Sequence, residues 1–112
     1  MCIRDSSVRF DTIGIRPIPR TPQTDDSPIV RIARDAARAL GENAPTAAGS
    51  TDSNIPMNLG IPAITIGGGG HGGGAHALGE WYQDGPDGYK GPQWALLTLV
   101  TLTSLPRAGV TP

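Results

Sequence analysis

The chain has 112 residues, enough for one small domain, and its 16 glycines and 11 prolines predict many turns and a thin hydrophobic core. Nine basic and ten acidic residues give a net charge of -1, which excludes the electrostatic signature of a nucleic-acid-binding or membrane-surface protein. The single cysteine, Cys2, excludes an internal disulfide, no apolar run approaches the ~20 residues that span a bilayer, and no secretory signal follows Met1, so we expect a soluble, cytoplasmic protein.

The first predicted element is a bulged or edge strand at residues 8–15. β-Branched and aromatic side chains are frequent there, but the apolar positions shift in phase between Phe10 and Ile13. Residues 16–22 contain three prolines, each of which removes a hydrogen-bond donor that a central strand needs. We therefore expect an extended loop after the strand.

A helix is predicted to begin near residue 27 and to end near Gly41. Asp26 or Ser27 is expected to cap its N-terminus, and Pro28 suits the first helical position. Gly41 is typical of a helix C-terminus. Apolar residues recur at helical spacing and form one stripe, whereas charged residues occupy the other face. The stripe consists of Ile29, Ala33, Ala36, Ala37 and Leu40.

Two further elements complete the expected fold. Residues 61–66 form a short apolar run that ends in four glycines, a pattern typical of a buried strand in a parallel sheet. A second helix is predicted from about Pro92 to Leu105, where Pro106 ends it. Its expected apolar face consists of Trp94, Leu97, Val100 and Leu105. The order strand, helix, strand, helix predicts an α/β fold.

Residues 67–74 hold seven glycines in eight positions, directly after the predicted strand 61–66. Glycine lets the backbone pass close to a ligand, and α/β folds place their sites at the C-terminal ends of strands. The segment is therefore a candidate binding loop. The alternative is a flexible turn that is rich in glycine.

His76 and Glu80 follow the glycine run at a spacing of four. One helical turn would place both on the same face, as a metal-ligating histidine and the carboxylate hydrogen-bonded to it require. The alternative is that His76 is an exposed loop histidine. His71 is a weaker candidate ligand, because it has no partner at a useful spacing. Zinc needs three or four protein ligands, and the chain has two histidines, so it does not easily complete a zinc site alone.

A serine-hydrolase site would combine Ser50 or Ser53 with His76 as base and Asp52 as its orienting carboxylate. No Gly-x-Ser-x-Gly motif surrounds either serine. The favoured interpretation of residues 50–54 is a polar turn of hydroxyl, Asp and Asn side chains.

Three segments, residues 49–56, 59–67 and 74–81, together resemble the C-terminal end of zinc-dependent metallopeptidases. That family includes tripeptide aminopeptidase (peptidase T), glutamate carboxypeptidase, aminoacylase and succinyl-diaminopimelate desuccinylase. The resemblance covers residues 8–105 and favours the tripeptide aminopeptidase branch. It implies an enzyme that hydrolyses peptide or N-acyl amino acid bonds with two zinc ions.

The resemblance also implies roles for individual residues. The family's histidine that ligates one of the two zinc ions corresponds to His76. Residues 14–17 match an element whose arginine reaches the substrate carboxylate, which makes Arg16 the candidate for that role. A guanidinium group suits this task because it binds a carboxylate through two parallel hydrogen bonds. The turn beside the substrate corresponds to Ser50, Thr51 and Asp52.

The family's other metal ligands lie upstream of these motifs and have no counterpart in the chain, so we expect a fragment that is inactive alone. Its expected parts are a non-family segment at 1–7, the end of the lid (dimerisation) domain at 8–17, the C-terminal part of the catalytic domain at 18–105, and a tail at 106–112. The expected fold class is an incomplete α/β zinc-peptidase domain with parallel-type strands and flanking helices, plus the last strand of the lid. A full-length enzyme would form a homodimer through its lid.

Two alternatives from other classes stay open. The first is a small non-enzymatic binding module in which the glycine-rich loop accommodates a ligand and His76 is incidental. The second is a truncated translation product without a function.

Overall fold

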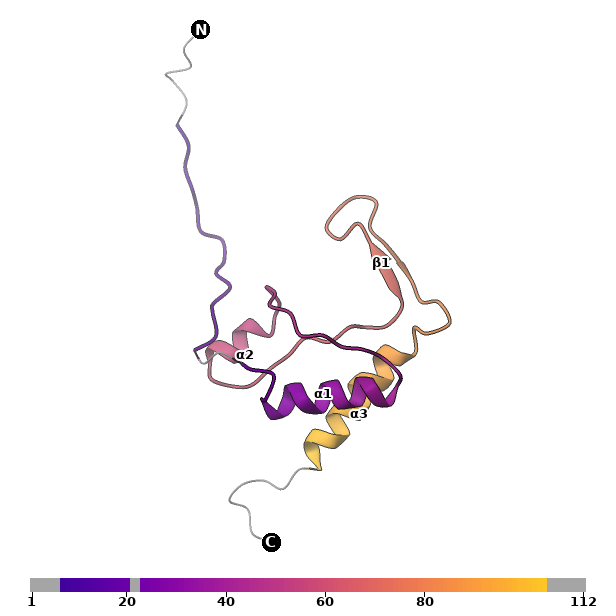
Figure 1. The fold of residues 1–112 in the computed structure, drawn as a ribbon. Helices are drawn as coiled ribbons and strands as arrows, with labels where there is room; N and C mark the ends of the chain where they lie inside the picture. Colours follow the sequence, from indigo (N-terminus) through magenta and orange to yellow (C-terminus); the bar gives the residue numbers. More distant parts are fainter. Residues whose placement is uncertain (1–6, 21–22, 105–112) are drawn as a thin grey trace.

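The computed structural model describes residues 7–20 and 23–104 (Figure 1). Within them, an extended segment at 7–20 precedes three helices and a two-stranded antiparallel sheet. In chain order the elements are α1 (Pro28–Ala39), α2 (Asn54–Asn58), β1 (His71–Gly73), β2 (Trp81–Gln83) and α3 (Lys90–Thr103). No helix in these two ranges combines the length and the apolar character needed to cross a membrane.

Helix α1 confirms the predicted boundaries. Ser27 occupies the N-cap position, but its side chain forms no capping hydrogen bond, and Pro28 opens the first turn. At the other end Gly41 has φ +76°, and its N–H donates to the carbonyl of Arg38 while that of Glu42 donates to Ala37. These two bonds form a Schellman motif, which satisfies carbonyls that the last turn would otherwise leave unpaired.

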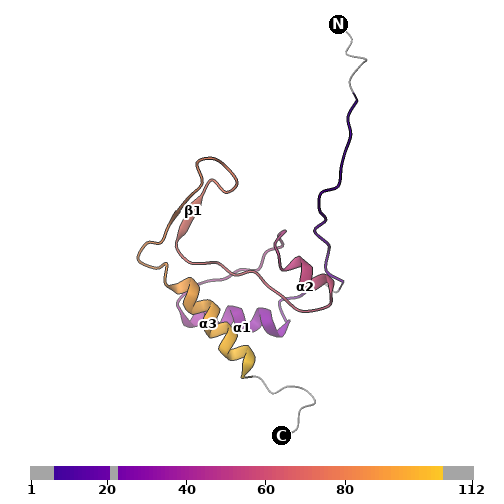
Figure 2. The same cartoon turned by 180° about the vertical axis from the view of Figure 1, so that it is seen from behind.

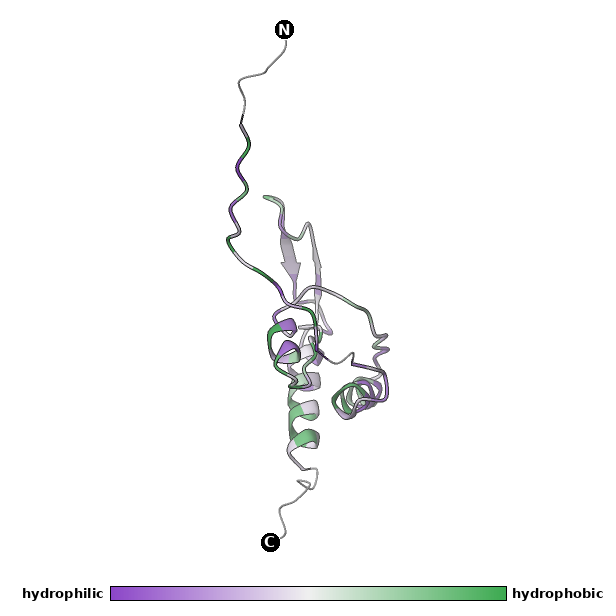
Figure 3. Cartoon of the chain, turned by 90° about the vertical axis from the view of Figure 1, so that its left-hand side faces the viewer, coloured by the Kyte–Doolittle hydropathy of each residue, from purple (hydrophilic) through white to green (hydrophobic). Residues whose placement is uncertain are grey.

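The hydrophobic core lies between α1 and α3. Four small residues of α1 are buried, namely Val30, Ala33, Ala36 and Ala37. Figure 3 views α1 along its axis, with α3 crossing it steeply. The indole Nε1 of Trp94 donates a 2.6 Å hydrogen bond to the carbonyl oxygen of Ala33 and so links the two helices. The core is therefore thin, as the composition predicts.

Only part of the predicted apolar face of α3 turns inward. Trp94 is half-buried against α1, but Leu97 and Val100 are 36% and 51% exposed. Gly91 and Thr98 are the buried residues of the helix, and the Thr98 hydroxyl has no hydrogen-bond partner among the described residues. The predicted inward face is thus confirmed at Trp94 and wrong at Leu97 and Val100, and the position of Gly91 is buried by the glycine-rich run instead.

The glycine-rich run packs against the beginning of α3. A methyl group at Gly91 would collide with the backbone of Gly68 and Gly69, and one at Gly69 would collide with Gly88. Glycine is thus required here for close backbone packing. Residues 71–73 then pair with 81–83 in an antiparallel hairpin with Gly72 opposite Tyr82.

Two predicted strands are absent from this structure. Residues 8–15 and 61–66 are extended but belong to no sheet, and no parallel strand pair occurs within residues 7–20 and 23–104. A strand needs a neighbour for its backbone groups, and these segments have none. At Ala63 the Gln23 side chain acts as the neighbour. Its amide nitrogen donates to the Ala63 carbonyl at 2.8 Å, and its amide oxygen accepts from the Ala63 N–H at 3.2 Å.

The described chain is far from compact. Its radius of gyration is 19.7 Å, whereas a compact domain of this length has about 13 Å. Residues 7–20 extend away from the helices in both views (Figures 1 and 2). The proposed tail at 106–112, Leu105 and all but the last residue of the segment 1–7 lie outside the described residues.

Replacing Trp94 by phenylalanine is expected to weaken the helix pair. The Trp94→Phe change keeps an aromatic ring but removes the donor to Ala33, so the free energy of unfolding should fall by about 1 kcal/mol. Urea titration followed by far-UV circular dichroism measures this loss. Trp81→Phe, in the exposed strand β2, is the matched control, and an equal loss in both variants would contradict the role of the hydrogen bond.

Candidate functional site

Arg16 and Asp52, two residues singled out from the sequence, contact each other in the structure. The Arg16 Nη1 atom lies 3.0 Å from the Asp52 Oδ1 atom across 36 residues of sequence. The Asp52 side chain is 97% exposed and that of Arg16 is 42% exposed. An ion pair this open to water contributes little to stability, and solvent or a second carboxylate can reach it.

Helix α2 holds the extended segment next to this pair. The Asn54 side chain donates to the carbonyl of Pro17 at 3.2 Å, and the Asn58 side chain donates to that of Ile18 at 2.8 Å. Both asparagines lie half-buried on α2. The carbonyls of an unpaired segment thus receive their donors from side chains, which fixes the position of Arg16 relative to the turn.

Local interactions shape the turn and α2. The Thr51 N–H donates to the Asn54 Oδ1 atom at 2.9 Å. At the helix end Gly60 has φ +82°, and the N–H groups of Gly60 and Ile61 donate to Met57 and Pro56. This second Schellman motif ends α2 after five residues. The polar turn expected at residues 50–54 is therefore followed by a short helix, α2, that no sequence pattern indicated.

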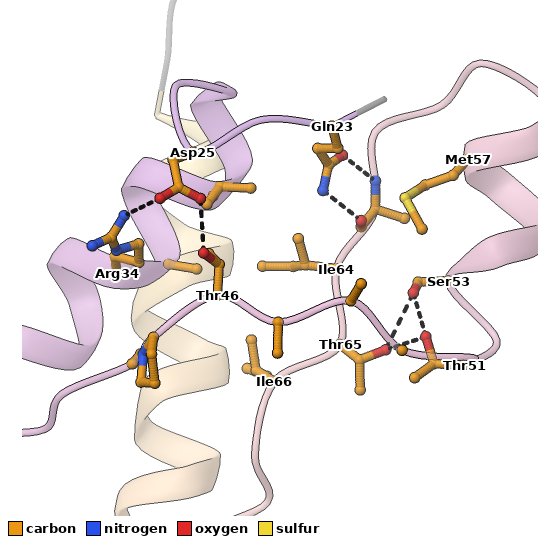
Figure 4. A pocket seen from close by; sticks show the side chains of 18 of the residues that line it. Gln23, Asp25, Arg34, Thr46, Thr51, Ser53, Met57, Ile64, Thr65 and Ile66 are labelled. Atoms are coloured by element: carbon orange, nitrogen blue, oxygen red, sulfur yellow. Dashed lines mark hydrogen bonds and ion pairs between the residues drawn. The ribbon is translucent and has the colours of Figure 1, made fainter. Parts of the chain in front are cut away.

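Three hydroxyl groups meet beside the turn. The oxygens of Thr51 and Ser53 lie 2.5 Å apart, and Thr65 donates to Thr51 at 2.9 Å and lies 3.3 Å from Ser53 (Figure 4). Ser50 is exposed and does not join the cluster. Hydroxyls can both donate and accept, so the cluster can hydrogen-bond either kind of ligand group.

The hydroxyl cluster borders a cavity of about 640 Å³ between α1 and the extended segments 44–49 and 63–66. Apolar side chains such as Ile64, Ile66 and Met57 form much of its wall (Figure 4). At its other end, Asp25 accepts hydrogen bonds from Arg34 at 3.1 Å and from Thr46 at 2.8 Å. Thr51 lines this cavity, whereas Arg16, Ser50 and Asp52 do not.

His76 lies in the loop between β1 and β2 rather than on a helical turn. Its φ of +66° is the one left-handed conformation found at a non-glycine residue within 7–20 and 23–104. The carboxylate of Glu80 accepts a 3.2 Å hydrogen bond from the backbone N–H of His76, not from its ring. The two residues are thus close, as their spacing predicted, but through the main chain.

The sequence-predicted residues fall into two separate groups. Arg16, Thr51 and Asp52 adjoin α2, whereas His76 and Glu80 belong to the hairpin loop at the far side of the molecule in both views (Figures 1 and 2). In the described ranges no three His, Cys, Asp or Glu side chains gather closely enough to hold a metal ion. Neither serine forms a hydrogen bond with His76 there, so the described chain assembles no Ser-His-Asp site.

A second cavity, of about 540 Å³, borders the glycine-rich run, His71 and Trp94. Lys90 stands at its edge and pairs with Glu42 at 2.7 Å and with Asp87 at 3.1 Å. Hydrogen bonds to these two carboxylates raise the pKa of Lys90 far above its ordinary value. The Lys90–Glu42 contact joins residues 48 positions apart, and no sequence pattern marked it.

Tyr82 carries the other shifted pKa in the described chain. Loss of hydration and the nearby Asp84 carboxylate raise it above 10.0, because both disfavour the phenolate. The Tyr82 hydroxyl lies 3.3 Å from the carbonyl of Gly69 and 3.4 Å from Asp84. This hydroxyl therefore ties the hairpin to the glycine run as a neutral donor.

Comparisons of the chain with protein-family models, curated proteins and solved structures found no match.

Lys90 is expected to make stability depend on pH only in the alkaline range. Its folded-state pKa exceeds the unfolded value of 10.5, so the ion pairs contribute fully below that pH and are lost as the pH rises through the folded-state value. Lys90→Met should therefore destabilise the chain more at about pH 9 than at about pH 11.5. Urea titrations at both values test this, and an equal loss at both would contradict it.

Proposed function

We propose that the chain is the C-terminal part of a cytoplasmic zinc-dependent metallopeptidase that hydrolyses peptide or N-acyl amino acid bonds. A tripeptide aminopeptidase-like enzyme is the preferred member of that family. In the proposal residues 8–17 end the lid, residues 18–105 belong to an α/β catalytic domain, and the full-length enzyme is a homodimer. The chain alone is inactive.

The contact between Arg16 and Asp52 is the observation that carries this proposal. The resemblance assigns both residues to the substrate, from motifs that are 36 residues apart, and their side chains are 3.0 Å apart in the structure. The pair is exposed, so a substrate carboxylate can replace Asp52 at the guanidinium group. Thr51, from the same turn, adjoins the cavity of about 640 Å³.

The residues present do not fit a zinc centre by themselves. His76 is exposed, and no group of three potential ligands exists within residues 7–20 and 23–104. A stable zinc site needs at least three protein ligands. Under the proposal His76 contributes one ligand, Glu80 fixes the loop backbone beside it, and the other ligands belong to a part of the protein that this chain lacks.

A binding module without catalytic activity is the second candidate. The cavity of about 640 Å³ has the size of a small-molecule site, and it combines an apolar wall with the three hydroxyls of Thr51, Ser53 and Thr65. A functionless translation product is the third candidate, and the thin core and extended shape favour it. It predicts thermal unfolding without cooperativity.

Extending the reading frame upstream of Ser7 in the source DNA separates these candidates. The proposal expects a His-x-Asp motif and a Glu-Glu pair there, and a purified complete protein that contains zinc and hydrolyses tripeptides or N-acyl amino acids. The 112-residue chain should show no metal-dependent hydrolysis. A frame without those motifs, or hydrolysis by the short chain alone, would refute the proposal.

Replacing His76 tests the zinc assignment in the complete protein. His76→Ala should remove zinc from one of the two positions and lower kcat/KM at least about 100-fold, since a ligand contributes more than the residues that support it. His71→Ala, a histidine from the same glycine-rich segment, is the control and should retain zinc and activity. Unchanged zinc content in His76→Ala would favour the binding module.

Replacing Arg16 tests the substrate assignment. Arg16→Ala should raise KM about tenfold or more for substrates with a free carboxylate and much less for the corresponding amides, because the guanidinium group recognises that charge. Arg16→Lys should restore only part of the affinity, since an ammonium group cannot form two parallel hydrogen bonds. Equal changes in KM for acids and amides would contradict this role.

A further inference from the structure

We propose that the cavity of about 640 Å³ between α1 and the extended segments 44–49 and 63–66 binds a neutral, flat apolar molecule that carries one carbonyl group. The inference does not rest on the proposed peptidase function, because Arg16, Asp52 and His76 do not line this cavity. Thr51 is shared with the proposed substrate site and enters here through its hydroxyl group alone. The inference applies to a fragment of an enzyme and to a binding module alike.

The wall of the cavity is largely apolar. Its apolar residues include Val30, Ala33, Met57, Ile64, Ile66 and Trp94. The indole Nε1 of Trp94 is already bonded to the Ala33 carbonyl, so the ring offers the cavity apolar surface alone. A volume of about 640 Å³ is within the range of small-molecule sites, and planar rings pack favourably beside an aromatic side chain. The wall therefore favours a flat apolar ligand.

The charged and amide side chains of the wall are already paired within the chain. Gln23 and Asn54 each donate and accept hydrogen bonds through their side-chain amides. Asp25 and Arg34 are the charged residues of the wall, and they pair with each other at 3.1 Å. A charged ligand would find no unpaired opposite charge, and burying a charge without a partner is unfavourable. The occupant is therefore neutral.

The hydroxyl cluster of Thr51, Ser53 and Thr65 leaves one hydrogen for a ligand. Three hydroxyl groups carry three hydrogens. Thr65 directs its hydrogen to the other two oxygens, at 2.9 and 3.3 Å, and one hydrogen lies between Thr51 and Ser53, whose oxygens are 2.5 Å apart. The third hydrogen has no acceptor among the described residues. A carbonyl oxygen, which accepts and does not donate, completes the cluster.

The apolar wall lies next to this hydroxyl hydrogen. In Figure 4, Ile64 and Ile66 lie between the hydroxyl cluster and the pair of Asp25 and Arg34. A ligand whose carbonyl group bonds to the cluster therefore places its apolar body against the two isoleucines.

Binding of the fluorescent ketone prodan tests the proposal. Prodan is a neutral, flat naphthalene derivative whose emission moves to shorter wavelength when it leaves water. Titration with the 112-residue chain should produce this shift. Excitation energy should pass to prodan more efficiently in Trp81→Phe, which retains Trp94 beside the cavity, than in Trp94→Phe, which retains Trp81 in the exposed strand β2.

Competition for the prodan site tests the chemical class of the ligand. Acetylnaphthalene should compete about tenfold more tightly than ethylnaphthalene, which has nearly the same shape but lacks the carbonyl group and its hydrogen bond. Naphthoate should compete less well than either, because its carboxylate is charged.

Removal of the hydroxyl cluster tests its role. The triple variant Thr51→Val, Ser53→Ala, Thr65→Val should lose the preference for acetylnaphthalene, whereas ethylnaphthalene should bind as before. Ser50→Ala combined with Thr101→Val removes hydroxyls outside the cavity and should retain the preference. Far-UV circular dichroism of each variant checks that the helices persist.

Several results would overturn the proposal. They are an unshifted prodan emission, equal energy transfer from Trp81 and Trp94, equal competition by acetylnaphthalene and ethylnaphthalene, tighter competition by naphthoate than by acetylnaphthalene, and a folded triple variant that keeps the preference. The ligand series uses the unaltered chain, so it decides the matter even where the triple variant fails to fold. None of these measurements involves zinc or hydrolysis, so their failure is distinct from failure of the peptidase proposal.

Discussion

The contact between α1 and α3 supports the rest of the described structure. Its buried side chains are small, and a single indole hydrogen bond, from Trp94 to Ala33, ties the two helices together. The glycine-rich run lies on the first turn of α3 because Gly91 leaves room for it, and the hairpin continues directly from that run. Small side chains thus replace a large apolar core, and at Gly91 backbone lies directly against backbone, so an added methyl group there would collide with Gly68 and Gly69.

Local signals in the sequence predicted the two long helices. Pro28 and Gly41 act within a few residues of themselves, so the boundaries of α1 follow from local backbone preferences, although the Ser27 hydroxyl accepts from the Thr24 N–H and not from the helix. Strands differ because they depend on neighbours far along the chain. Residues 8–15 and 61–66 have the composition of strands, but the described chain supplies no partner for either. The hairpin was missed for the opposite reason, since glycines in β1 hide the alternation that marks a strand.

The candidate site was predictable only in its separate parts. The motif around Arg16 and the turn at residues 50–52 each stand out in the sequence, but their contact depends on Asn54 and Asn58, whose side chains hold the preceding carbonyls. No spacing rule anticipates such bonds. The four-residue spacing of His76 and Glu80 did predict proximity. Because His76 has a positive φ, however, the two residues lie in a loop and not on one helical turn, and Glu80 contacts the backbone N–H of His76. Thr65 joins Thr51 and Ser53 from a segment that is apolar at its other positions, so nothing in the sequence singled out this hydroxyl.

The bond pattern between Gln23 and Ala63 has a consequence for the assembly of sheets. A carboxamide offers one donor and one acceptor side by side, as a peptide group does, so Gln23 acts as a strand one residue long. A complete strand that approached from that side would have to displace it. One edge of residues 61–66 is thereby blocked at its centre, and the opposite edge carries Pro62, which has no N–H to donate. The Gln23 side chain and the proline ring thus each obstruct one edge, so neither side of this extended segment offers a full set of backbone groups to an added strand.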